Sequence, residues 1–588
     1  MSIIFKYLKK REWSMAIVSI LFIVGQVWLD LKLPDYMQKV TMLVQTEGSA
    51  MSEIWKSGLK MLLCALGSMV LSILTGFLAA KIAAGYSKRV RHLIFDKVSS
   101  FSMEEINQFS TASLITRSTN DVVQLQMLIA LGLQVMIKGP ILAVWAIIKI
   151  LGKNWQWTAA TGGAVILLFM IIGTALVFAF PKFKKIQTLN DNLNRVVREN
   201  LNGIRVVRAY NAEDYQQNKF EKANDDLTFT HRFTGRIMSI MNPGMSLIMN
   251  GLPLAIYWIG TYLIDREGDM AQKGQLFANM VTFSSYYAMQ VVMAFLMMIM
   301  IFVLLPRASV SAQRIKEVLN TIPKIHDGNL PSGDTKLHGE IEFKNVNFKY
   351  PDAADYVLKN ISFTAKQGET VAFIGSTGSG KSTLINLVPR FYDATEGEVI
   401  VDGENVKNYK LEDLYNKIGY VSQKTVMFSG TVSSNVAFGE SINDFSDEDV
   451  KNAVAVAQST DFVESMKNGY NASIAQGGTN LSGGQKQRLS IARAVCRDPE
   501  IYIFDDSFSA LDYKTDRLLR SELKKKYADK TMLIVAQRIG TIKDADRIIV
   551  LDEGEIAGMG THSELLKNCE VYQEIALSQL SKEELENE

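Results

Sequence analysis

The chain divides into an apolar first part and a more polar second part. Five long runs in the first part contain no Asp, Glu, Lys or Arg: residues 13–29, 61–80, 154–181, 237–264 and 274–306. A sixth run, residues 122–148, is interrupted only by Lys138. Crossing the hydrocarbon core of a membrane takes about 20 apolar residues, whereas a run of about 10 to 14 is more typical of a buried helix. The pattern therefore predicts six membrane-spanning helices.

Basic residues gather on alternate connections between these runs. They are Lys6, Lys9, Lys10 and Arg11, then Lys81, Lys88, Arg89, Arg91 and Lys97, then Lys182, Lys184, Lys185, Arg195, Arg198, Arg205 and Arg208. By the positive-inside rule, both termini and the two long connections are predicted to be cytoplasmic. Apolar residues recur at helical spacing within residues 186–222, so the membrane helices are expected to continue well beyond the bilayer.

After residue 319 the pattern changes to that of a soluble α/β domain. Pro323, Gly328, Pro331 and Gly333 mark a linker. Residues 341–350 alternate like a strand with one slip, which is consistent with a bulge, and residues 369–374, 501–504 and 532–535 are short apolar runs typical of buried parallel strands. We therefore predict a transmembrane domain over 1–319, a linker over 320–336, a soluble domain over 337–580 and a polar tail over 581–588.

Composition excludes several classes of protein. The 588 residues contain 63 Lys and Arg against 61 Asp and Glu, so there is no global basic field for nucleic acid. Cys64, Cys496 and Cys569 are far apart, which argues against a disulfide framework or a zinc site. Asp30 follows the first apolar run. Two interpretations remain: an ordinary carboxylate at the membrane interface, or a charge that attracts cationic compounds.

A glycine-rich motif follows the apolar run that ends at Ile374. Its residues are Gly375, Ser376, Thr377, Gly378, Ser379, Gly380, Lys381 and Ser382, and a helical pattern begins at Thr383. Backbone amides of such a loop cradle phosphate, the lysine reaches the β- and γ-phosphates, and the serine hydroxyl binds Mg²⁺. A later apolar run, residues 501–504, is followed by Asp505. A carboxylate at the end of such a strand completes the magnesium site in P-loop proteins, so Asp505 is the expected magnesium partner. The two motifs predict a site for nucleotide and Mg²⁺.

A second glycine-rich element consists of Leu481, Ser482, Gly483, Gly484 and Gln485, and it precedes a helical run. A serine and two glycine amides at the start of a helix can bind anionic oxygen. Two phosphate-binding elements in one domain need not bind the same nucleotide. Their presence is explained if each site combines one element from this chain with one from a second chain.

Together these motifs resemble those of the ATP-binding cassette exporters, and the resemblance covers essentially the whole chain. Ser509, Ala510, Leu511 and Asp512 match the family's D-loop. The resemblance implies an α-helical membrane domain, with six transmembrane helices and long cytoplasmic extensions, followed by an α/β P-loop ATPase domain. It also implies a multi-pass protein of a bacterial inner or plasma membrane, in which two such chains bind ATP together. The ATP lies between the Walker A (residues 375–382) and Walker B (residues 501–505) motifs of one chain and the signature (residues 481–485) of the other.

The resemblance assigns roles to individual residues. Tyr350 matches the ring that stacks on adenine, and Gln423 matches the Q-loop residue that contacts magnesium. The implied ATP-binding residues are Tyr350, Gly375, Ser376, Thr377, Gly378, Ser379, Gly380, Lys381, Ser382, Thr383, Gln423, Ser482, Gly483, Gly484 and Gln485, and the implied Mg²⁺ ligands are Ser382, Gln423 and Asp505. Residues 113–117 with Asn120 and Asp121, and residues 202–208, resemble the surface that couples the two domains.

Two catalytic positions depart from the family pattern. Asp506 stands where the family has a glutamate base, and Gln537 stands where it has the switch histidine. The shorter carboxylate lies about 1.5 Å further back, and a misplacement of about 1 Å can cost ~100-fold in rate. Glutamine cannot titrate. We therefore expect a site that binds ATP but hydrolyses it poorly, in a heterodimer with a homologous half-transporter that has the intact Glu and His.

The substrate is less defined by the sequence. Methionines at i, i+4 spacing, with aromatic residues nearby, are typical of adaptable apolar binding surfaces and equally of helix packing. They are Met241, Met245 and Met249, then Met289, Met293 and Met297. The expected partners are the lipid bilayer and amphipathic small molecules of the multidrug type. A lipid exporter, a peptide exporter and a regulatory ATP-binding subunit remain as alternatives.

Overall fold

The computed structural model describes residues 6–46, 48–151, 154–330, 336–351, 353–439 and 445–579. The chain forms two compact units, one of Met1–Ser99 with Ala112–Thr321 and one of Ser100–Thr111 with Ile322–Glu588. The sequence analysis put residues 100–111 in the membrane domain, whereas their contacts group them with the second unit. The predicted tail over 581–588 lies outside the described residues, as do residues 331–335 of the predicted linker.

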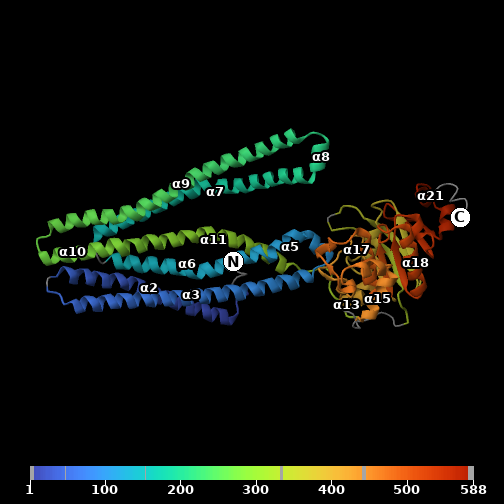
Figure 1. The fold of residues 1–588 in the computed structure, drawn as a ribbon, viewed down its shortest axis with the longest axis horizontal. Coiled ribbons are helices and arrows are strands. Elements are labelled where there is room, and N and C mark those ends of the chain that lie inside the picture. Colours follow the sequence, from blue (N-terminus) through green and yellow to red (C-terminus); the bar gives the residue numbers. More distant parts are fainter. Residues whose placement is uncertain are drawn as a thin grey trace. The chain divides into compact units, whose positions relative to one another are not determined.

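The described residues of the first unit form helices joined by short connections (Figure 1). Its helices are α2 (Lys10–Gln45), α3 (Met51–Ser99), α5 (Thr111–Ser118), α6 (Asn120–Leu151), α7 (Trp155–Asn202), α8 (Ile204–Ala209), α9 (Glu213–Arg266), α10 (Met270–Thr282), the π-helical turn η1 (Phe283–Tyr287) and α11 (Ala288–Asn320). The described residues contain six helical stretches that are long and apolar enough to cross a membrane. The prediction of six spans is confirmed, and the chain is a multi-pass membrane protein.

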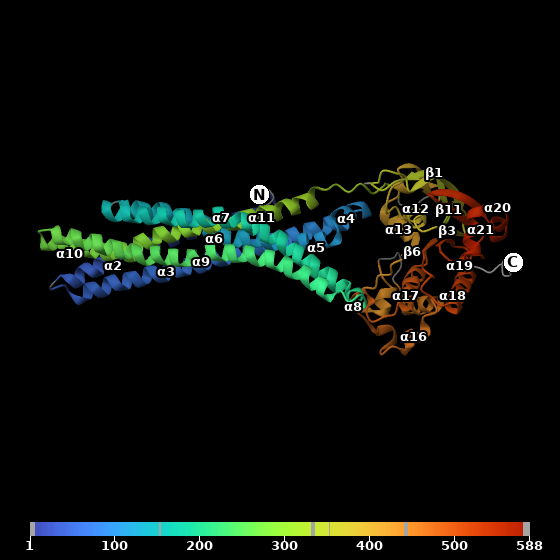
Figure 2. The same ribbon diagram turned by 90° about the horizontal axis from the view of Figure 1, so that it is seen from above.

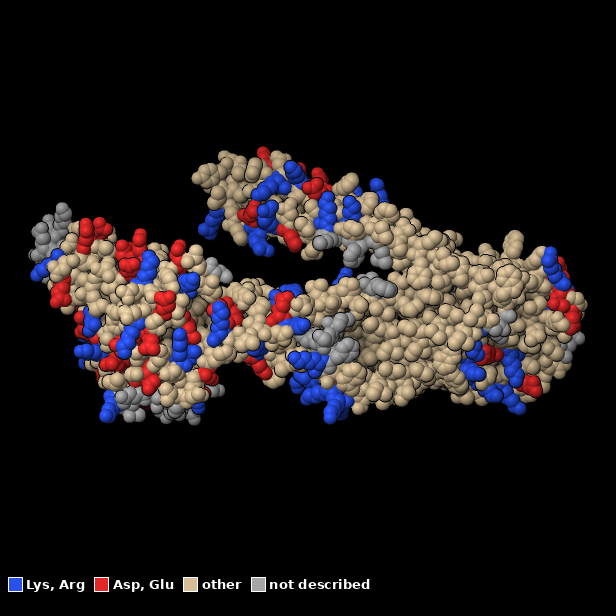
Figure 3. All heavy atoms as spheres, turned by 180° about the vertical axis from the view of Figure 1, so that it is seen from behind, with Lys and Arg blue, Asp and Glu red and all other residues tan. Residues whose placement is uncertain are grey.

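Several of these helices are much longer than a membrane is thick. The 54 residues of α9 extend for about 80 Å at 1.5 Å per residue, compared with roughly 30 Å of hydrocarbon. Helices α7 and α9 pair along their length and separate from the other helices toward α8, and a space-filling view shows an open gap on that side (Figures 1 and 3). Near the end of this arm, Val206 is 61% exposed and Tyr210 is 80% exposed.

Ion pairs join the apolar helices of the first unit. Asp30 accepts a hydrogen bond from the Ser68 hydroxyl and lies 3.4 Å from the Lys138 ammonium. Asp35 accepts hydrogen bonds from Lys149 at 2.8 Å and from the Tyr287 hydroxyl at 2.5 Å. Because α2 continues to Gln45, Asp30 lies within the helix. Its charge is matched by Lys138, which weakens the idea that it attracts cationic compounds.

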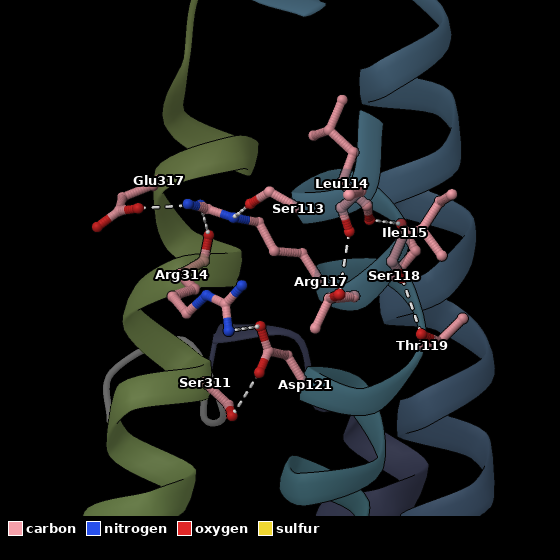
Figure 4. A network of polar contacts seen from close by, with 12 residues as sticks. Ser113, Leu114, Ile115, Arg117, Ser118, Thr119, Asp121, Ser311, Arg314 and Glu317 are labelled. Carbon is pink, nitrogen blue, oxygen red and sulfur yellow. Dashed lines mark hydrogen bonds and ion pairs between the residues drawn. The ribbon is translucent and has the colours of Figure 1, made fainter. Parts of the chain in front are cut away.

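A second polar network joins α5 and α6 to α11 (Figure 4). Asp121 accepts a hydrogen bond from Ser311 at 2.8 Å and lies 3.3 Å from the Arg314 guanidinium. Arg117 donates to the Arg314 carbonyl at 2.6 Å and pairs with Glu317 at 2.9 Å. The sequence analysis assigned Arg117 and Asp121 to the coupling surface. Their side chains hold three helices of one unit together, and the coupling role stays a prediction.

The second unit contains two main β-sheets with helices around them. Its strands are β1 (Ile341–Phe348), β2 (Leu358–Ala365), β3 (Thr370–Gly375), β4 (Glu396–Val401), β5 (Glu404–Asn405), β6 (Ile418–Val421), β7 (Gly430–Thr431), β8 (Ser473–Ile474), β9 (Ile501–Asp505), β10 (Thr531–Val535), β11 (Arg547–Asp552) and β12 (Glu555–Gly560). The larger sheet has the order β12-β11-β3-β10-β9-β6, and the smaller one has the order β2-β1-β4-β5. The pairing of β1 with β2 shifts register between Phe343 and Val346, where the sequence pattern slipped.

Helices cover both faces of the larger sheet (Figure 2). The helices of this unit are α4 (Met103–Phe109), α12 (Lys381–Leu387), α13 (Leu411–Asn416), α14 (Val432–Val436), α15 (Asp447–Val456), α16 (Thr460–Ser465), α17 (Gly483–Cys496), α18 (Tyr513–Lys526), α19 (Ile539–Ile542), α20 (His562–Asn568) and α21 (Glu570–Leu577). Along β9, Tyr502 and Phe504 pack in a core with α17, whereas Ile501 and Ile503 pack in a core with α12. This alternation is why the strand is apolar at every position.

The network of Figure 4 makes a prediction about the stability of the membrane unit. The substitution Asp121→Ala removes the acceptor of Ser311 and leaves the Arg314 charge without its carboxylate. We expect a loss of about 1–3 kcal/mol, seen as a melting temperature several degrees lower for the detergent-purified chain. The exposed Asp225→Ala on α9 serves as the control and should melt like the unmodified chain. Equal melting temperatures for both variants would contradict the role given to Asp121.

Candidate nucleotide site

The sheet brings four predicted site segments to one edge. Strand β10 pairs in parallel with β3 and with β9, and β6 pairs in parallel with β9. Parallel strands place their carboxyl ends on the same side, where ligands bind in open α/β sheets. Gly375 ends β3 and Asp505 ends β9, while Gln537 and Gln423 follow β10 and β6 by two residues. Segments that are up to 162 residues apart in sequence, from residue 375 to residue 537, therefore meet at one place.

The loop after β3 requires glycine for two different reasons. A Cβ at Gly375 would lie 2.0 Å from the Leu551 carbonyl oxygen, so only glycine fits beside β11. Gly380 has φ +97°, and a Cβ there would lie 2.7 Å from a methyl group of Leu358. The loop then leads into α12 at Lys381, whose ammonium donates to the carbonyls of Gly375 at 2.9 Å and Ser376 at 2.7 Å. The lysine charge is thus held over the loop.

The predicted magnesium ligands Ser382 and Asp505 are in direct contact. The Ser382 hydroxyl donates to Asp505 Oδ1 at 2.8 Å. Burial raises the pKa of Asp505, and this hydrogen bond opposes the rise. Burial lowers the pKa of Lys381, whereas the nearby carboxylates of Asp506 and Asp505 raise it. A hydroxyl and a carboxylate oxygen side by side are the hard ligands that Mg²⁺ takes from proteins, with phosphates supplying others, so these residues fit that ion.

Asp506 lies at the centre of the candidate catalytic residues. Its Oδ2 accepts a hydrogen bond from Gln537 Nε2 at 3.0 Å and one from Gln423 Nε2 at 3.4 Å. Its φ of +46° is unusual for a residue with a side chain. Burial raises the pKa of Asp506, and the hydrogen bond from Gln423 lowers it. One carboxylate oxygen is therefore shared by the side chains of the two loops.

Two aromatic rings pack against Tyr350, the residue predicted to stack on adenine. The Tyr350 hydroxyl lies 3.1 Å from the Thr383 hydroxyl. Phe348 packs edge-on against Tyr350 with ring centroids 5.0 Å apart, and Tyr392 does so at 5.4 Å. The Tyr392 hydroxyl also accepts a hydrogen bond from Asn107 of α4 at 3.1 Å. Tyr392 was not among the sequence-predicted residues, because a tyrosine in a polar segment carries no distinctive signal.

The short helix α4 was also missed by the sequence analysis. The Glu105 carboxylate caps it by accepting from Ser102 and also accepts from the Lys324 backbone amide at 3.1 Å. Glu104 pairs with the Lys324 side chain. The capping pattern Ser102-x-x-Glu105 is visible in the sequence and could have revealed this helix.

The second glycine-rich element lies away from this cluster, as the separate positions of α12 and α17 show (Figure 2). Ser482 caps α17: its hydroxyl accepts from the Gln485 amide at 3.3 Å, and its own amide donates to the Gln485 side chain at 2.9 Å. A Cβ at Gly484 would lie 3.2 Å from the Ala510 carbonyl oxygen. Ser482, Gly483, Gly484 and Gln485 thus form a rigid helix start beside the predicted D-loop.

Fold and site together define a P-loop ATPase joined to a six-helix membrane unit. A family model described as the ABC transporter transmembrane region matches residues 16–295, and one described as ABC transporter matches residues 358–509. An uncharacterised ABC transporter ATP-binding protein of Mycobacterium bovis is 40% identical over 519 residues, covering 88% of this chain and 86% of that protein. The chain belongs to the ABC transporter family, and it is an exporter half-transporter.

Two further relatives and one solved structure are informative. The ABC transporter ATP-binding protein YfiB of Bacillus subtilis is 35% identical, covering 90% of each chain. An ATP-dependent lipid A-core flippase of Pseudomonas savastanoi is 30% identical, covering 85% of this chain and 82% of that protein. The structure of a bacterial Atm1-family ABC exporter with ATP bound superimposes with a TM-score of 0.73 at 23% identity, covering 97% of this chain and 99% of that one. The predicted fold class is confirmed.

The position of Lys381 predicts a loss of nucleotide binding on its removal. Lys381→Ala deletes the only charge that the loop after β3 holds over its own carbonyls. We expect the affinity for a fluorescent ATP analogue to fall more than about tenfold, in line with a charged hydrogen bond of ~1.5–3 kcal/mol. Lys451→Ala on the exposed side of α15 is the control and should bind normally. Unchanged binding by Lys381→Ala would mean that nucleotide binds elsewhere.

Proposed function

We propose that this chain is one half of a heterodimeric, ATP-driven exporter of amphipathic compounds. Its own site binds ATP and Mg²⁺ but hydrolyses ATP poorly. Its signature element completes the active site of a homologous partner chain that carries the intact Glu and His. The ATPase domain and both termini are cytoplasmic in this proposal, and the helices cross a bacterial inner or plasma membrane.

The arrangement around Asp506 is the observation that carries the proposal. A general base must approach the attacking water to within hydrogen-bond distance, and an aspartate reaches less far than a glutamate. The Asp506 oxygen that would accept that proton already accepts hydrogen bonds from Gln537 and Gln423. Gln537 supplies an amide that neither titrates nor carries charge. Both features reduce turnover without weakening the phosphate-binding loop.

Unlike the two catalytic positions, the residues proposed to bind nucleotide have the expected side chains and contacts. Ser382 and Asp505 fit Mg²⁺, which when bound would neutralise phosphate charge. Lys381 lies over the loop after β3, and Tyr350 is braced by Phe348 and Thr383. The departures from the family pattern thus affect the catalytic positions and not the binding residues, which supports a site that still binds ATP.

The partner is argued from two surfaces of this chain. The signature start at Ser482 and Gly484 is well formed, yet it lies apart from the cluster around Lys381. The arm of α7 and α9 ends in exposed apolar side chains such as Val206 and Tyr210. Exposed apolar surface of this kind is typical of an interface. Both features support a second, homologous chain. This chain has a well-formed signature but lacks the family's catalytic Glu, which supports a partner chain that has the Glu and uses this signature.

The choice of substrate rests on the membrane helices. Met241, Met245 and Met249 are partly buried against the core of the bundle, whereas Met293 is 39% exposed and Tyr257 is 37% exposed. Flexible apolar side chains at a partly open surface suit varied amphipathic molecules. The flippase of Pseudomonas savastanoi supports lipid export as the second candidate, and peptide export or a regulatory ATP-binding role are the remaining alternatives.

Restoring the two catalytic side chains tests the proposal at this chain's own site. In a transporter whose partner has Gln in place of its catalytic Glu, the variant Asp506→Glu with Gln537→His should raise steady-state ATP hydrolysis severalfold or more, because it supplies the longer base and the imidazole. With the partner intact, Asp506→Asn should change hydrolysis little. A large loss in Asp506→Asn, with no gain in the restored variant, would show that the natural site already hydrolyses at the family's rate.

Transport assays separate the substrate candidates. The transporter in proteoliposomes should accumulate a fluorescent amphipathic dye when ATP is supplied outside, and Lys→Ala in the partner's Walker A should abolish the uptake. Movement of labelled lipid without dye uptake would favour the flippase alternative. Nucleotide binding with neither movement would favour the regulatory one.

A further inference from the structure

The loop that carries Gln537 is held by a residue near the C-terminal end of the described chain. Gln579 Nε2 donates to the Gln537 carbonyl at 2.7 Å, and Gln579 Oε1 accepts from the Ile539 amide at 2.9 Å. One side-chain amide thus bonds to the backbone on both sides of Arg538. We propose that Gln579 is the positioning residue of the switch loop, and that the C-terminal helix α21 thereby controls the reach of residue 537 into the nucleotide site.

The loop needs such a partner for a physical reason. Ile539 is the first residue of α19, and the first amides of any helix have no acceptor within the helix. Ile539 itself is buried, so water is a poor substitute. On the strand side, the loop is fixed by the Ala536 amide, which donates to the Phe373 carbonyl at 3.2 Å. The strand side of the loop is therefore held at Ala536, and Gln579 holds the rest of the loop at Gln537 and Ile539.

Gln579 stands on a rigid base. Tyr572 and Ala576 of α21 are fully buried in the core of the unit. The Tyr572 hydroxyl lies 2.7 Å from His562 Nδ1 on α20, which ties the two C-terminal helices together. The Gln579 amide continues from this helix by donating to the Ala576 carbonyl at 3.0 Å. A shift of α21 would consequently be passed to the loop.

The other end of the connection is the catalytic cluster. The Gln537 backbone is held by Gln579, and the Gln537 side chain donates to Asp506 Oδ2 at 3.0 Å. The path from α21 to Asp506 therefore consists of two direct hydrogen bonds through a single residue. Gln579 contacts neither the loop around Lys381 nor Tyr350 through its described hydrogen bonds, so it is expected to affect turnover rather than nucleotide affinity.

Hydrogen exchange tests the contact without reference to catalysis. In the full-length transporter, Gln579→Ala should speed amide exchange in a peptide covering residues 536–542 about fivefold or more, because the Ile539 amide loses its acceptor. Exchange in β9 should stay the same, which also shows that the variant is folded. The control Gln573→Ala removes an amide of α21 that bonds to the Leu566 carbonyl, and it should leave the loop unchanged. If Gln579→Ala fails to fold, Gln579→Glu is used: it keeps an acceptor for the Ile539 amide but sets a carboxylate oxygen against the Gln537 carbonyl, and it should lower kcat in the assay below.

Kinetics decide whether the contact positions residue 537. When the partner's catalytic Glu is replaced by Gln, so that only this chain's site can turn over, Gln579→Ala in the Asp506→Glu, Gln537→His background should lower kcat about tenfold and leave KM for ATP within about twofold. The changes in kcat and KM are also measured in the chain that keeps Asp506 and Gln537. The inference can therefore still be tested if that natural site hydrolyses ATP well. Unchanged exchange in the loop overturns the inference. So does faster exchange with unchanged kcat in both backgrounds, since the contact would then be structural only.

Discussion

The parallel alignment of β3, β10, β9 and β6 is the constraint on which the nucleotide site depends. Each strand ends at the same edge of the sheet, and a residue with a predicted chemical role either ends the strand or follows it by two residues. The spacing of these residues in the chain is irrelevant once the strands pair. Both cores of the unit serve this alignment, because they bury the two faces of β9 up to its end at Asp505, which contacts Ser382.

This arrangement also supports the proposal that two substitutions lower hydrolysis while ATP binding is retained. Asp506 and Gln537 lie at the ends of adjacent strands, β9 and β10, and their side chains meet. Lys381 and Ser382 belong to the loop and helix that follow β3, and their hydrogen bonds do not involve Gln537. The residues proposed to hold phosphate therefore keep their own contacts, whereas those proposed to govern hydrolysis bond to each other.

Much of this architecture could be predicted from the sequence because it depends on local periodicity. Six apolar runs became six long helices, and the slip near Val346 became a shift of strand register. What could not be predicted depends on side chains that meet only in the folded state. The contacts of Arg117 with α11 could not be predicted, because a charged face looks the same whether it contacts a neighbouring helix or solvent. Gln579 and Tyr392 carry no motif, and only the fold places them beside the loop and the adenine position.

The central claim is that ATP stays intact at this chain's own site while the transporter works. The most direct measurement is photo-crosslinking of radiolabelled azido-ATP during steady-state turnover, followed by separation of the two chains and identification of the nucleotide on each. The account predicts ATP attached to this chain near Lys381 and mostly ADP attached to the partner. Mostly ADP on this chain, formed at the rate of overall turnover, would contradict it.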